Sequence, residues 1–249
     1  IVDQIEKDMD TRGKQDTLSY YAFTATPKKK TLKLFGTSIS SQDNIPFHTY
    51  SMKQAIQEGF ILDMLKNYTT YDRQFRIVKT ASEDKVVEGK KASQALLKYV
   101  DLHHRNVSTK SKIIVEHFRD HTLLKIGGLA KAMVVGSSRA QALKYKQEID
   151  DYIKKNNYQG IKTLVAFSGT LKDDEGNICT EQSMNGTSTD RELREKFDSK
   201  EYNILIVAEK YQTGFDQPLL HTMYVDKKLH GIKAVQTLSR INRTNTGKT

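Results

Sequence analysis

Two arginines near the C-terminal end of the chain are the side chains best suited to chemistry. Gln236, Arg240 and Arg243 are spaced four and three residues apart, so on a helix, where each residue advances about 100°, they share one face. Guanidinium groups pair well with phosphate oxygens. The spacing therefore predicts a helix that presents a glutamine and two arginines to a phosphate group.

The opposite face of this helix carries apolar residues that would hold it in place. They are Val235, Leu238 and Ile241. A helix that is apolar on one side packs that side against a core. We therefore expect the arginine-bearing face to point away from the core, toward a ligand.

A short stretch upstream, Thr213-Gly-Phe-Asp216, contains groups that suit a phosphate or a sugar. Gly214 lets a backbone approach a phosphate closely, and Thr213 offers a hydroxyl. Asp216 ends the stretch with a carboxylate. Taken alone, the same four residues also suit an ordinary structural turn, so their interpretation depends on their surroundings.

The elements that must position these groups alternate regularly from residue 129 onward, as expected of a parallel α/β sheet. The strand at residues 203–208 is almost wholly apolar, which implies that both faces of the sheet are covered. In such sheets ligands bind beyond the carboxyl ends of the strands, where Ser168, Gly169 and residues 213–216 are expected. The other expected elements are strands at residues 130–135, 161–166 and 221–226, and helices at residues 139–155, 191–197 and around Gln236.

The first part of the chain is less regular. Residues 17–23 are rich in β-forming side chains and predict a strand that runs into Thr24, Thr26 and a proline. Two hydroxyls at the end of a strand can face a ligand, although an ordinary strand exit has the same composition. Residues 51–66 have a helical pattern, residues 80–126 look mostly helical and polar, and residues 170–188 look like a polar loop.

Histidine and cysteine usage excludes some chemistry. His117 and His121 are four residues apart, as in some zinc sites, but no glutamate or cysteine stands at a suitable spacing. This favours solvated or capping histidines, and we predict no metal site. The single cysteine, Cys179, excludes an internal disulfide and fits a reducing compartment.

Composition indicates a class of partner. The chain has 249 residues, 28% of them charged, and a net charge of +10. This basic balance suits a polyanion, nucleic acid first, although a lysine-biased solvated surface has the same charge. No stretch approaches the roughly 20 apolar residues that span a bilayer, and no signal peptide is visible, so we expect a cytoplasmic protein with no membrane partner.

The ends of the chain lead us to expect a piece of a longer polypeptide, because it begins at Ile1 without methionine and stops at Thr249. The stretch Thr246-Gly-Lys-Thr249 resembles the end of a phosphate-binding loop. However, Asn242 stands where that motif requires its first glycine, and the stretch follows a helix rather than a strand. We therefore predict that the chain has no nucleotide-binding loop of its own.

Taken together, three motifs resemble motifs III, V and VI of superfamily 2 helicases and translocases, in that order. They are Thr24-Ala-Thr-Pro27, Thr213-Gly-Phe-Asp216 and Gln236-x-x-x-Arg240-x-x-Arg243. Residues 47–63 and 66–71 narrow the resemblance to the R (HsdR) subunit of type I restriction-modification enzymes. The resemblance covers essentially the whole chain.

The resemblance implies a RecA-like α/β lobe within an ATP-dependent translocase of double-stranded DNA. Residues 1–38 would end a first RecA-like lobe with its last strand, residues 39–128 would form a largely helical linker, and residues 129–249 would form the second lobe. ATP and Mg²⁺ would serve the full-length enzyme, with none bound by this chain alone. The family also implies an upstream endonuclease domain, methylation and specificity subunits as partners, and a bacterial or archaeal cytoplasm.

The resemblance also implies residue roles at the DNA. Thr24 and Thr26 would couple the ATP cleft to the DNA track, and Thr213 would meet the DNA backbone together with Gly214. Ser168 and Gly169, at the end of their expected strand, are further candidates for nucleic-acid binding.

The remaining roles concern the nucleotide. Gly214 is also a candidate for cofactor binding, and Asp216 would meet the nucleotide ribose or the adjoining arginine. Arg240 and Arg243 would reach across a cleft from this lobe to the γ-phosphate held by the first motor lobe. Arg243 would be the arginine finger, which stabilises the charge that develops in phosphoryl transfer. Gln236 would position its helix or the nucleotide.

Two alternatives to this motor stay open. One is a non-catalytic basic module that holds DNA or a partner protein, and the other is a motor lobe of another superfamily 2 repair or remodelling helicase. ATP hydrolysis by the isolated chain distinguishes an autonomous enzyme from a binding module, and we expect none. Residues 47–71 argue against the repair or remodelling helicase.

Overall fold

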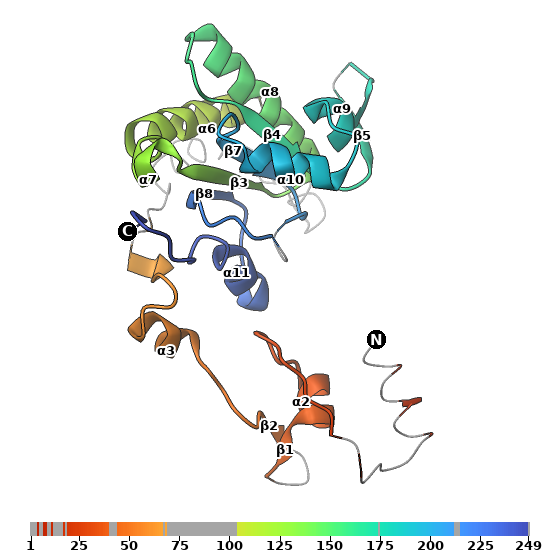
Figure 1. The fold of residues 1–249 in the computed structure, drawn as a ribbon. Helices are drawn as coiled ribbons and strands as arrows, with labels where there is room; N and C mark the ends of the chain where they lie inside the picture. Colours follow the sequence, from red (N-terminus) through yellow and green to blue (C-terminus); the bar gives the residue numbers. More distant parts are fainter. Residues whose placement is uncertain are drawn as a thin grey trace, which may run out of the picture. The chain divides into compact units, whose positions relative to one another are not determined.

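The computed structural model describes residues 4, 7, 8, 11, 17, 19–39, 44–66, 68, 104–173, 175–211 and 215–248. The chain forms two compact units, residues 1–58 and residues 59–249 (Figure 1). The predicted division into residues 1–38, 39–128 and 129–249 stays a prediction.

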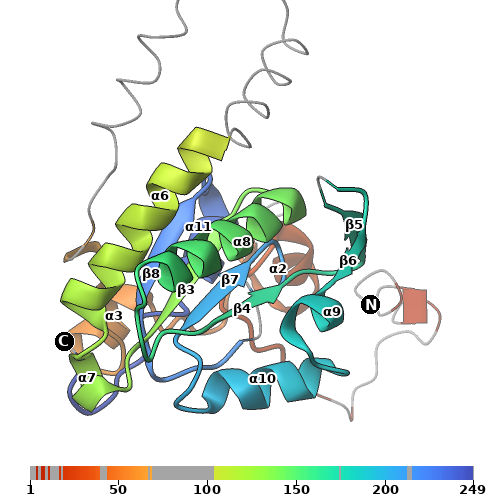
Figure 2. The same cartoon turned by 90° about the horizontal axis from the view of Figure 1, so that it is seen from above.

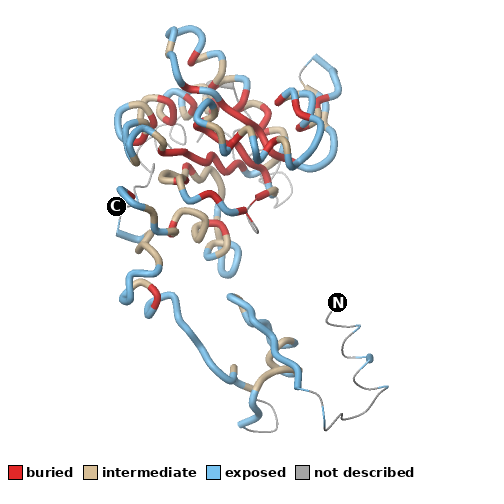
Figure 3. The backbone as a smooth tube through the Cα atoms, viewed as in Figure 1, coloured by how far each residue is buried: buried red, intermediate tan, exposed pale blue. Residues whose placement is uncertain are grey.

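The first unit is built from short elements with little buried surface (Figure 3). They are the helix α2 (Lys29–Phe35), the antiparallel pair β1 (Thr37–Ser38) and β2 (Asn44–Ile45), and the helix α3 (Met52–Gln57). Gly36 joins α2 to β1, and a Cβ added to it would lie 2.8 Å from the carbonyl oxygen of Ile45. A larger residue would therefore separate α2 from β2.

The predicted strand at residues 17–23 is wrong in its described part. Residues 19–24 have no regular secondary structure, and the side chains of Tyr20, Tyr21 and Phe23 are exposed. A strand needs a neighbour for its backbone hydrogen bonds, and the described part of the chain offers none to this segment.

The predicted helix at residues 51–66 is shorter than its pattern suggests. It begins as expected, because the side chain of Ser51 accepts a hydrogen bond from the N–H of Gln54. It ends at Gln57, and Gly59 follows with a left-handed φ of 76°. Met64–Lys66 is a separate 3-10 turn, η1.

The second unit contains a parallel sheet, as predicted. Its four strands lie in the order β4 (Thr163–Ala166), β7 (Ile204–Val207), β3 (Lys131–Gly136) and β8 (Leu220–Asp226), and all neighbours are parallel. All four residues of β7 are fully buried, which confirms that its apolar run is covered on both faces.

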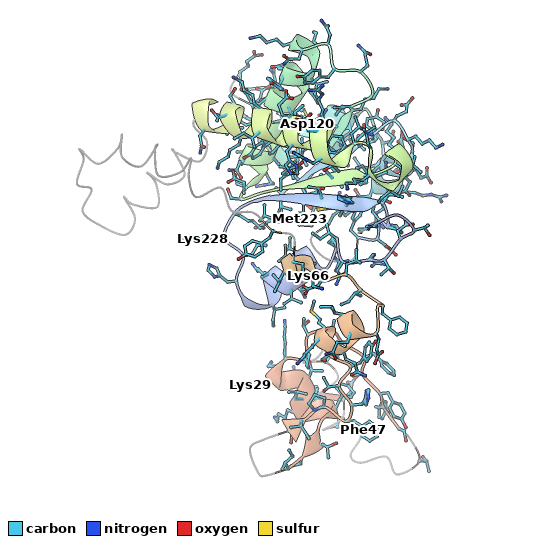
Figure 4. The ribbon with its side chains drawn as sticks, turned by 90° about the vertical axis from the view of Figure 1, so that its left-hand side faces the viewer. Lys29, Phe47, Lys66, Asp120, Met223 and Lys228 are labelled. Carbon is cyan, nitrogen blue, oxygen red and sulfur yellow. The ribbon has the colours of Figure 1, made fainter. Side chains whose placement is uncertain are left out.

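Two hydrophobic clusters cover the two faces of this sheet. One joins alternate strand residues such as Val134 and Ile206 to the helices α6 (His104–His117) and α8 (Arg139–Lys155), which lie together over one face (Figure 2). The other joins residues such as Met133 to the helix α10 (Asp190–Asp198) and to the connection before β8. Met223 belongs to the second face, and α11 (Gly231–Leu238) lies on the same side of the sheet (Figure 4).

The helices begin where their caps predict. The side chain of Ser138 accepts from the N–H of Gln141 at the start of α8, and that of Thr189 accepts from Glu192 at the start of α10. Residues 104–122 are helical, as α6 and a π-helical turn η2 (Phe118–Thr122), followed by the turn α7 (Lys125–Gly128). Residues 80–103 of the predicted helical stretch lie outside the described residues.

The histidine pair lies at the junction of α6, η2 and β8. Nδ1 of His117 is 2.9 Å from the hydroxyl of Tyr224 on β8, and the rings of His117 and His121 are 4.8 Å apart. Among the described residues, no three potential metal ligands gather in one place. In the same part of the chain, every helix is too short or too polar to cross a bilayer.

The predicted polar loop at residues 170–188 is wrong, because it contains regular structure. It forms the hairpin β5 (Thr170–Lys172) and β6 (Ile178–Thr180) and the helix α9 (Glu181–Asn185). A capping box between Thr180 and Ser183 starts α9. Elements this short leave no periodicity in the sequence.

Helix α9 completes the edge of the sheet with its side chains. Asn185 accepts from the N–H of Val165 and donates to its carbonyl, and Glu181 accepts from the N–H of Phe167. These contacts satisfy backbone groups of β4 that a further strand would otherwise pair with.

Candidate functional site

One pocket of the second unit gathers both predicted arginines. It has a volume of about 490 Å³ and lies between the connection before β8, the residues after α11 and the segment after Gly59. Its lining residues are Phe60, Ile61, Asp216, Pro218, Ser239, Arg240, Asn242, Arg243 and Thr244. We call it the arginine pocket.

Arg243 and Asp216 form an ion pair in this pocket. Nη1 of Arg243 lies 2.6 Å from Oδ1 of Asp216, and the two side chains are 40% and 61% exposed. An exposed pair of this kind contributes only about 0–1 kcal/mol, so the guanidinium is not committed to its carboxylate. The structure thus brings together two residues that the sequence singled out separately.

Arg240 is held more firmly. Its Nη1 donates to the carbonyl of Phe215 at 2.9 Å and its Nε donates to the carbonyl of Gln236 at 3.1 Å. Burial lowers the pKa of Arg240, and the positive charge of Arg243 adds to this effect while Asp216 opposes it. Because an arginine stays protonated in proteins, Arg240 is a fixed cation at the pocket wall.

The predicted helix through Arg243 is wrong. Helix α11 ends at Leu238, where Ser239 follows as its cap, and Arg240 lies in the turn beyond. The N–H of Leu62 donates to the carbonyl of Asn242 at 2.7 Å, and Ile61 and Arg243 form an antiparallel bridge. A residue paired in this way is extended, so the pairing is incompatible with a helix that continues through Arg243.

The predicted apolar face of that helix is confirmed in part. Ile241 packs against the core, whereas Val235 is 39% exposed and the buried residue of α11 is Thr237. Gln236 contributes its backbone carbonyl to Arg240 and is not among the lining residues of the arginine pocket. Its predicted role toward a nucleotide stays a prediction.

Phe60 and Ile61 line the pocket although the sequence did not single them out for this site. They lie about 180 residues before Arg243, inside a stretch with a helical pattern. Gly59 was the available signal that the helix ends before Phe60, because a glycine in a helical pattern can mark a helix end. Nothing local indicates which distant segment they would meet.

Ser168 and Gly169 follow the carboxyl end of β4, as predicted. Both are exposed, and Gly169 has a left-handed φ of 79°. Nη1 of Arg139, at the start of α8, donates to the carbonyl of Ser168 at 3.0 Å. These residues are not among those that line the arginine pocket, so the second unit holds two separate groups of predicted site residues.

The other predicted residues cannot be joined to either group. Thr213 and Gly214 lie outside the described residues. Thr24 and Thr26 lie in the first unit, where the N–H of Thr26 donates to Oγ1 of Thr24 at 3.1 Å. That bond closes a local turn, and both proposed roles stay predictions.

The chemistry of the arginine pocket suits an anion. Two guanidinium groups face one carboxylate, which leaves a net positive charge, and a volume of about 490 Å³ is in the range of small-ligand sites. The two cations fit the phosphates of a nucleotide. Among the described lining residues Asp216 is the sole carboxylate and is paired with Arg243, so these residues by themselves do not fit Mg²⁺, which needs free oxygen ligands.

Comparison with known proteins finds similarity to subunits of type I restriction enzymes. A family model described as type I restriction enzyme subunit R domain 3 matches residues 181–249. The HindI endonuclease subunit of a type I restriction enzyme from Haemophilus influenzae is 26% identical, over 92% of this chain and 22% of the relative. A type I endonuclease subunit of Staphylococcus aureus is 25% identical, over 90% of this chain and 26% of the relative.

A third relative is the MjaVIIIP protein of Methanocaldococcus jannaschii, which is named as a candidate endonuclease subunit of a type I restriction enzyme. It is 29% identical, over 91% of this chain and 24% of the relative. The chain thus spans about a quarter of the length of the curated relatives it matches.

Proposed function

We propose, from its similarity to the R (HsdR) subunits of type I restriction enzymes, that the chain supplies part of an ATP-dependent motor that moves double-stranded DNA. In this proposal, residues 129–249 are the second RecA-like lobe of the motor. The arginine pocket is the part of that lobe that senses the nucleotide.

The observation that supports the proposal is the pairing of Arg243 with Asp216 at the open arginine pocket. Arg240 is anchored by two carbonyls, whereas Arg243 has one exposed carboxylate as its partner. An arginine that stabilises developing charge must be able to reach its phosphate. Arg243 meets this requirement better than Arg240, which agrees with its proposed role as the finger.

ATP, when bound in the full-length protein, would supply the phosphoryl group that is transferred. The residues of this chain that would hold its phosphates are Arg240 and Arg243. Asp216 would keep Arg243 oriented until the phosphates compete for it. Mg²⁺ and the remaining phosphate contacts would come from residues outside this pocket, in the first motor lobe.

Double-stranded DNA is the proposed polyanion, and the net charge of +10 supports it. The exposed Ser168 and Gly169, at the carboxyl end of β4, are the proposed contacts to its backbone. Methylation and specificity subunits are the proposed partners of the full-length protein, and a bacterial or archaeal cytoplasm is its proposed location.

The test is the variant Arg243→Ala in the full-length protein that contains this chain. We expect DNA-stimulated ATP hydrolysis to fall by about 10³-fold or more, because an arginine finger contributes that much to phosphoryl transfer. Arg191→Ala is the matched control, since Arg191 also pairs with one carboxylate at 2.8 Å but is 88% exposed on α10.

Near-normal hydrolysis in Arg243→Ala would refute the assignment of the finger. Circular dichroism and thermal unfolding of both variants establish that the fold is retained. The isolated chain of 249 residues is expected to hydrolyse no ATP, and hydrolysis by it would contradict the need for a first lobe.

A further inference from the structure

The turn after β7 has an unusual backbone. Glu209 and Tyr211 have φ values of 60° and 61°, in the left-handed region that residues with a Cβ disfavour. Between them, the N–H of Lys210 donates to the carbonyl of Ala208 at 2.7 Å. Such a conformation persists only where the surroundings impose it, and it is often found beside functional sites.

The side chain of Lys210 connects this turn to the neighbouring helices α9 and α10. Its Nζ donates to both carboxylate oxygens of Glu181, at 2.7 and 2.9 Å, and to Oδ1 of Asp190 at 2.7 Å. The side chains of Lys210 and Glu181 are 15% and 3% exposed. We call these three residues the Lys210 cluster.

The cluster is charged. Burial raises the pKa of Glu181, against the effect of its hydrogen bond with Lys210. Burial alone would lower the pKa of Lys210, but its hydrogen bonds to Asp190 and Glu181 outweigh burial and raise it. Because the ammonium group has three oxygen acceptors within 2.9 Å, we take Lys210 as protonated and its partners as carboxylates.

On one side, the Lys210 cluster touches the carboxyl end of β4. Oε2 of Glu181, which accepts from Lys210, also accepts from the backbone N–H of Phe167 at 2.9 Å. Phe167 directly precedes Ser168 and Gly169. A change in the backbone at the proposed DNA contact therefore reaches the Lys210 cluster through one hydrogen bond.

On the other side, the cluster leads to the arginine pocket. The ring of Tyr211 packs 4.9 Å from that of Phe215, and Tyr211 is buried. The carbonyl of Phe215 accepts from Arg240, and the next residue, Asp216, pairs with Arg243. Nζ of Lys210 lies 5.2 Å from the centroid of the Tyr211 ring. The contacts of Lys210 and Tyr211 thus connect Ser168 and Gly169 with the arginine pocket.

We propose that Lys210 is a positioning residue that couples DNA contact at the Ser168–Gly169 end of β4 to the orientation of Arg240 in the arginine pocket. The inference rests on the proposed function, because it concerns the regulation of the same pocket. Coupling between two bound ligands is reciprocal, so nucleotide in the pocket should in turn strengthen DNA contact at β4.

The test compares ATP hydrolysis by the full-length protein with and without double-stranded DNA. In Lys210→Met, which keeps an unbranched side chain one atom shorter than lysine and removes its charge, the stimulation ratio should fall roughly 3- to 30-fold. The DNA-free rate should change less than this ratio. Lys210→Arg, which can pair with both carboxylates, should restore most of the stimulation.

Lys162→Met is the matched control, because Lys162 pairs with Glu201 at 3.3 Å on the surface, where the side chains are 57% and 65% exposed. It should leave the stimulation ratio unchanged. Where Lys210→Met does not fold, Asp190→Asn takes its place, since the side chain of Asp190 is 56% exposed and its loss weakens the same cluster.

An unchanged stimulation ratio in a folded variant of the cluster overturns the inference. Equal losses of the DNA-free and DNA-stimulated rates overturn it as well, because they indicate a structural role. Arg243→Ala separates this outcome from failure of the proposed function. If that variant loses hydrolysis while Lys210→Met keeps its stimulation ratio, the coupling is wrong and the motor assignment stands.

Discussion

Arg243 pairs with Asp216 across 2.6 Å at the wall of an open pocket, and neither side chain is buried. The pair holds the guanidinium in place without removing it from solvent. A phosphate that enters the pocket must compete with a single carboxylate, which gives that carboxylate a measurable influence on anion affinity.

Removal of that competition should strengthen anion binding. In Asp216→Asn, the chain should bind inorganic pyrophosphate roughly fivefold more tightly, because an exposed ion pair contributes up to about 1 kcal/mol. Isothermal titration at low salt measures the change. Glu195→Gln removes the carboxylate of the exposed Arg191 pair and should have no effect. Unchanged or weaker pyrophosphate binding in Asp216→Asn would show that the carboxylate does not compete.

The two arginines should differ in their effect on stability. Arg240→Ala removes hydrogen bonds to the carbonyls of Phe215 and Gln236 and should lower the free energy of unfolding by about 1–3 kcal/mol. Arg243→Ala removes an exposed ion pair and should lower it by less than about 1 kcal/mol. Urea unfolding of the isolated chain measures both, and a larger loss in Arg243→Ala would contradict the assignment of Arg240 as the anchored residue.

Asn185 should be far more important for stability than its position in a short helix suggests. Asn185→Ala leaves the N–H and carbonyl of Val165 without partners at the sheet edge, and we expect a loss of about 2–4 kcal/mol. Asn156→Ala, at an exposed site where the side chain bonds only the carbonyl of Tyr152, is the control and should change stability by less than about 1 kcal/mol. Similar unfolding midpoints for the two variants would exclude the proposed edge role.

Stability should fall as the solution is made acidic through the histidine range. Burial lowers the pKa of His117 and that of His221 below the ordinary value of 6.5, with added effects of His121 on the first and of Lys248 and Lys125 on the second. The unfolded chain therefore takes up protons at higher pH than the folded chain. The stabilisation is fully present above pH 6.5 and is lost as pH drops through the lower folded values.

Thermal unfolding at about pH 7.5 and about pH 5.5 tests this prediction. His117→Gln and His221→Gln should each flatten the dependence of the melting temperature on pH. A pH dependence that both variants retain in full would assign it to other groups.

The parallel sheet was predictable because its signals are local. The apolar run at residues 204–207 and the caps at Ser138 and Thr189 each depend on neighbours within a few residues. Arg240 and Arg243 could be singled out from the sequence because their residue type and their spacing are also local features. The ion pair of Arg243 with Asp216, and the presence of both arginines in one pocket, followed only in outline from the resemblance.

The errors arise where distant segments decide the local structure. The helical spacing continues past Leu238, but pairing of residues 61 and 62 with residues 242 and 243 ends the helix there. Likewise, residues 170–188 look like a polar loop because their polar side chains bind backbone groups of β4 that lie elsewhere in the sequence. Neither partner can be identified from the spacing of residues within one segment.

The hydrogen bonds between α9 and the edge of β4 also affect whether a further strand can pair with this sheet. The side chains of Glu181 and Asn185 lie along the outer edge of β4 and already bond the N–H and carbonyl of Val165 and the N–H of Phe167, so an added strand cannot pair with these groups. An additional strand, whether from the same polypeptide or from another subunit, would have to displace α9 before it could pair with β4 at Val165.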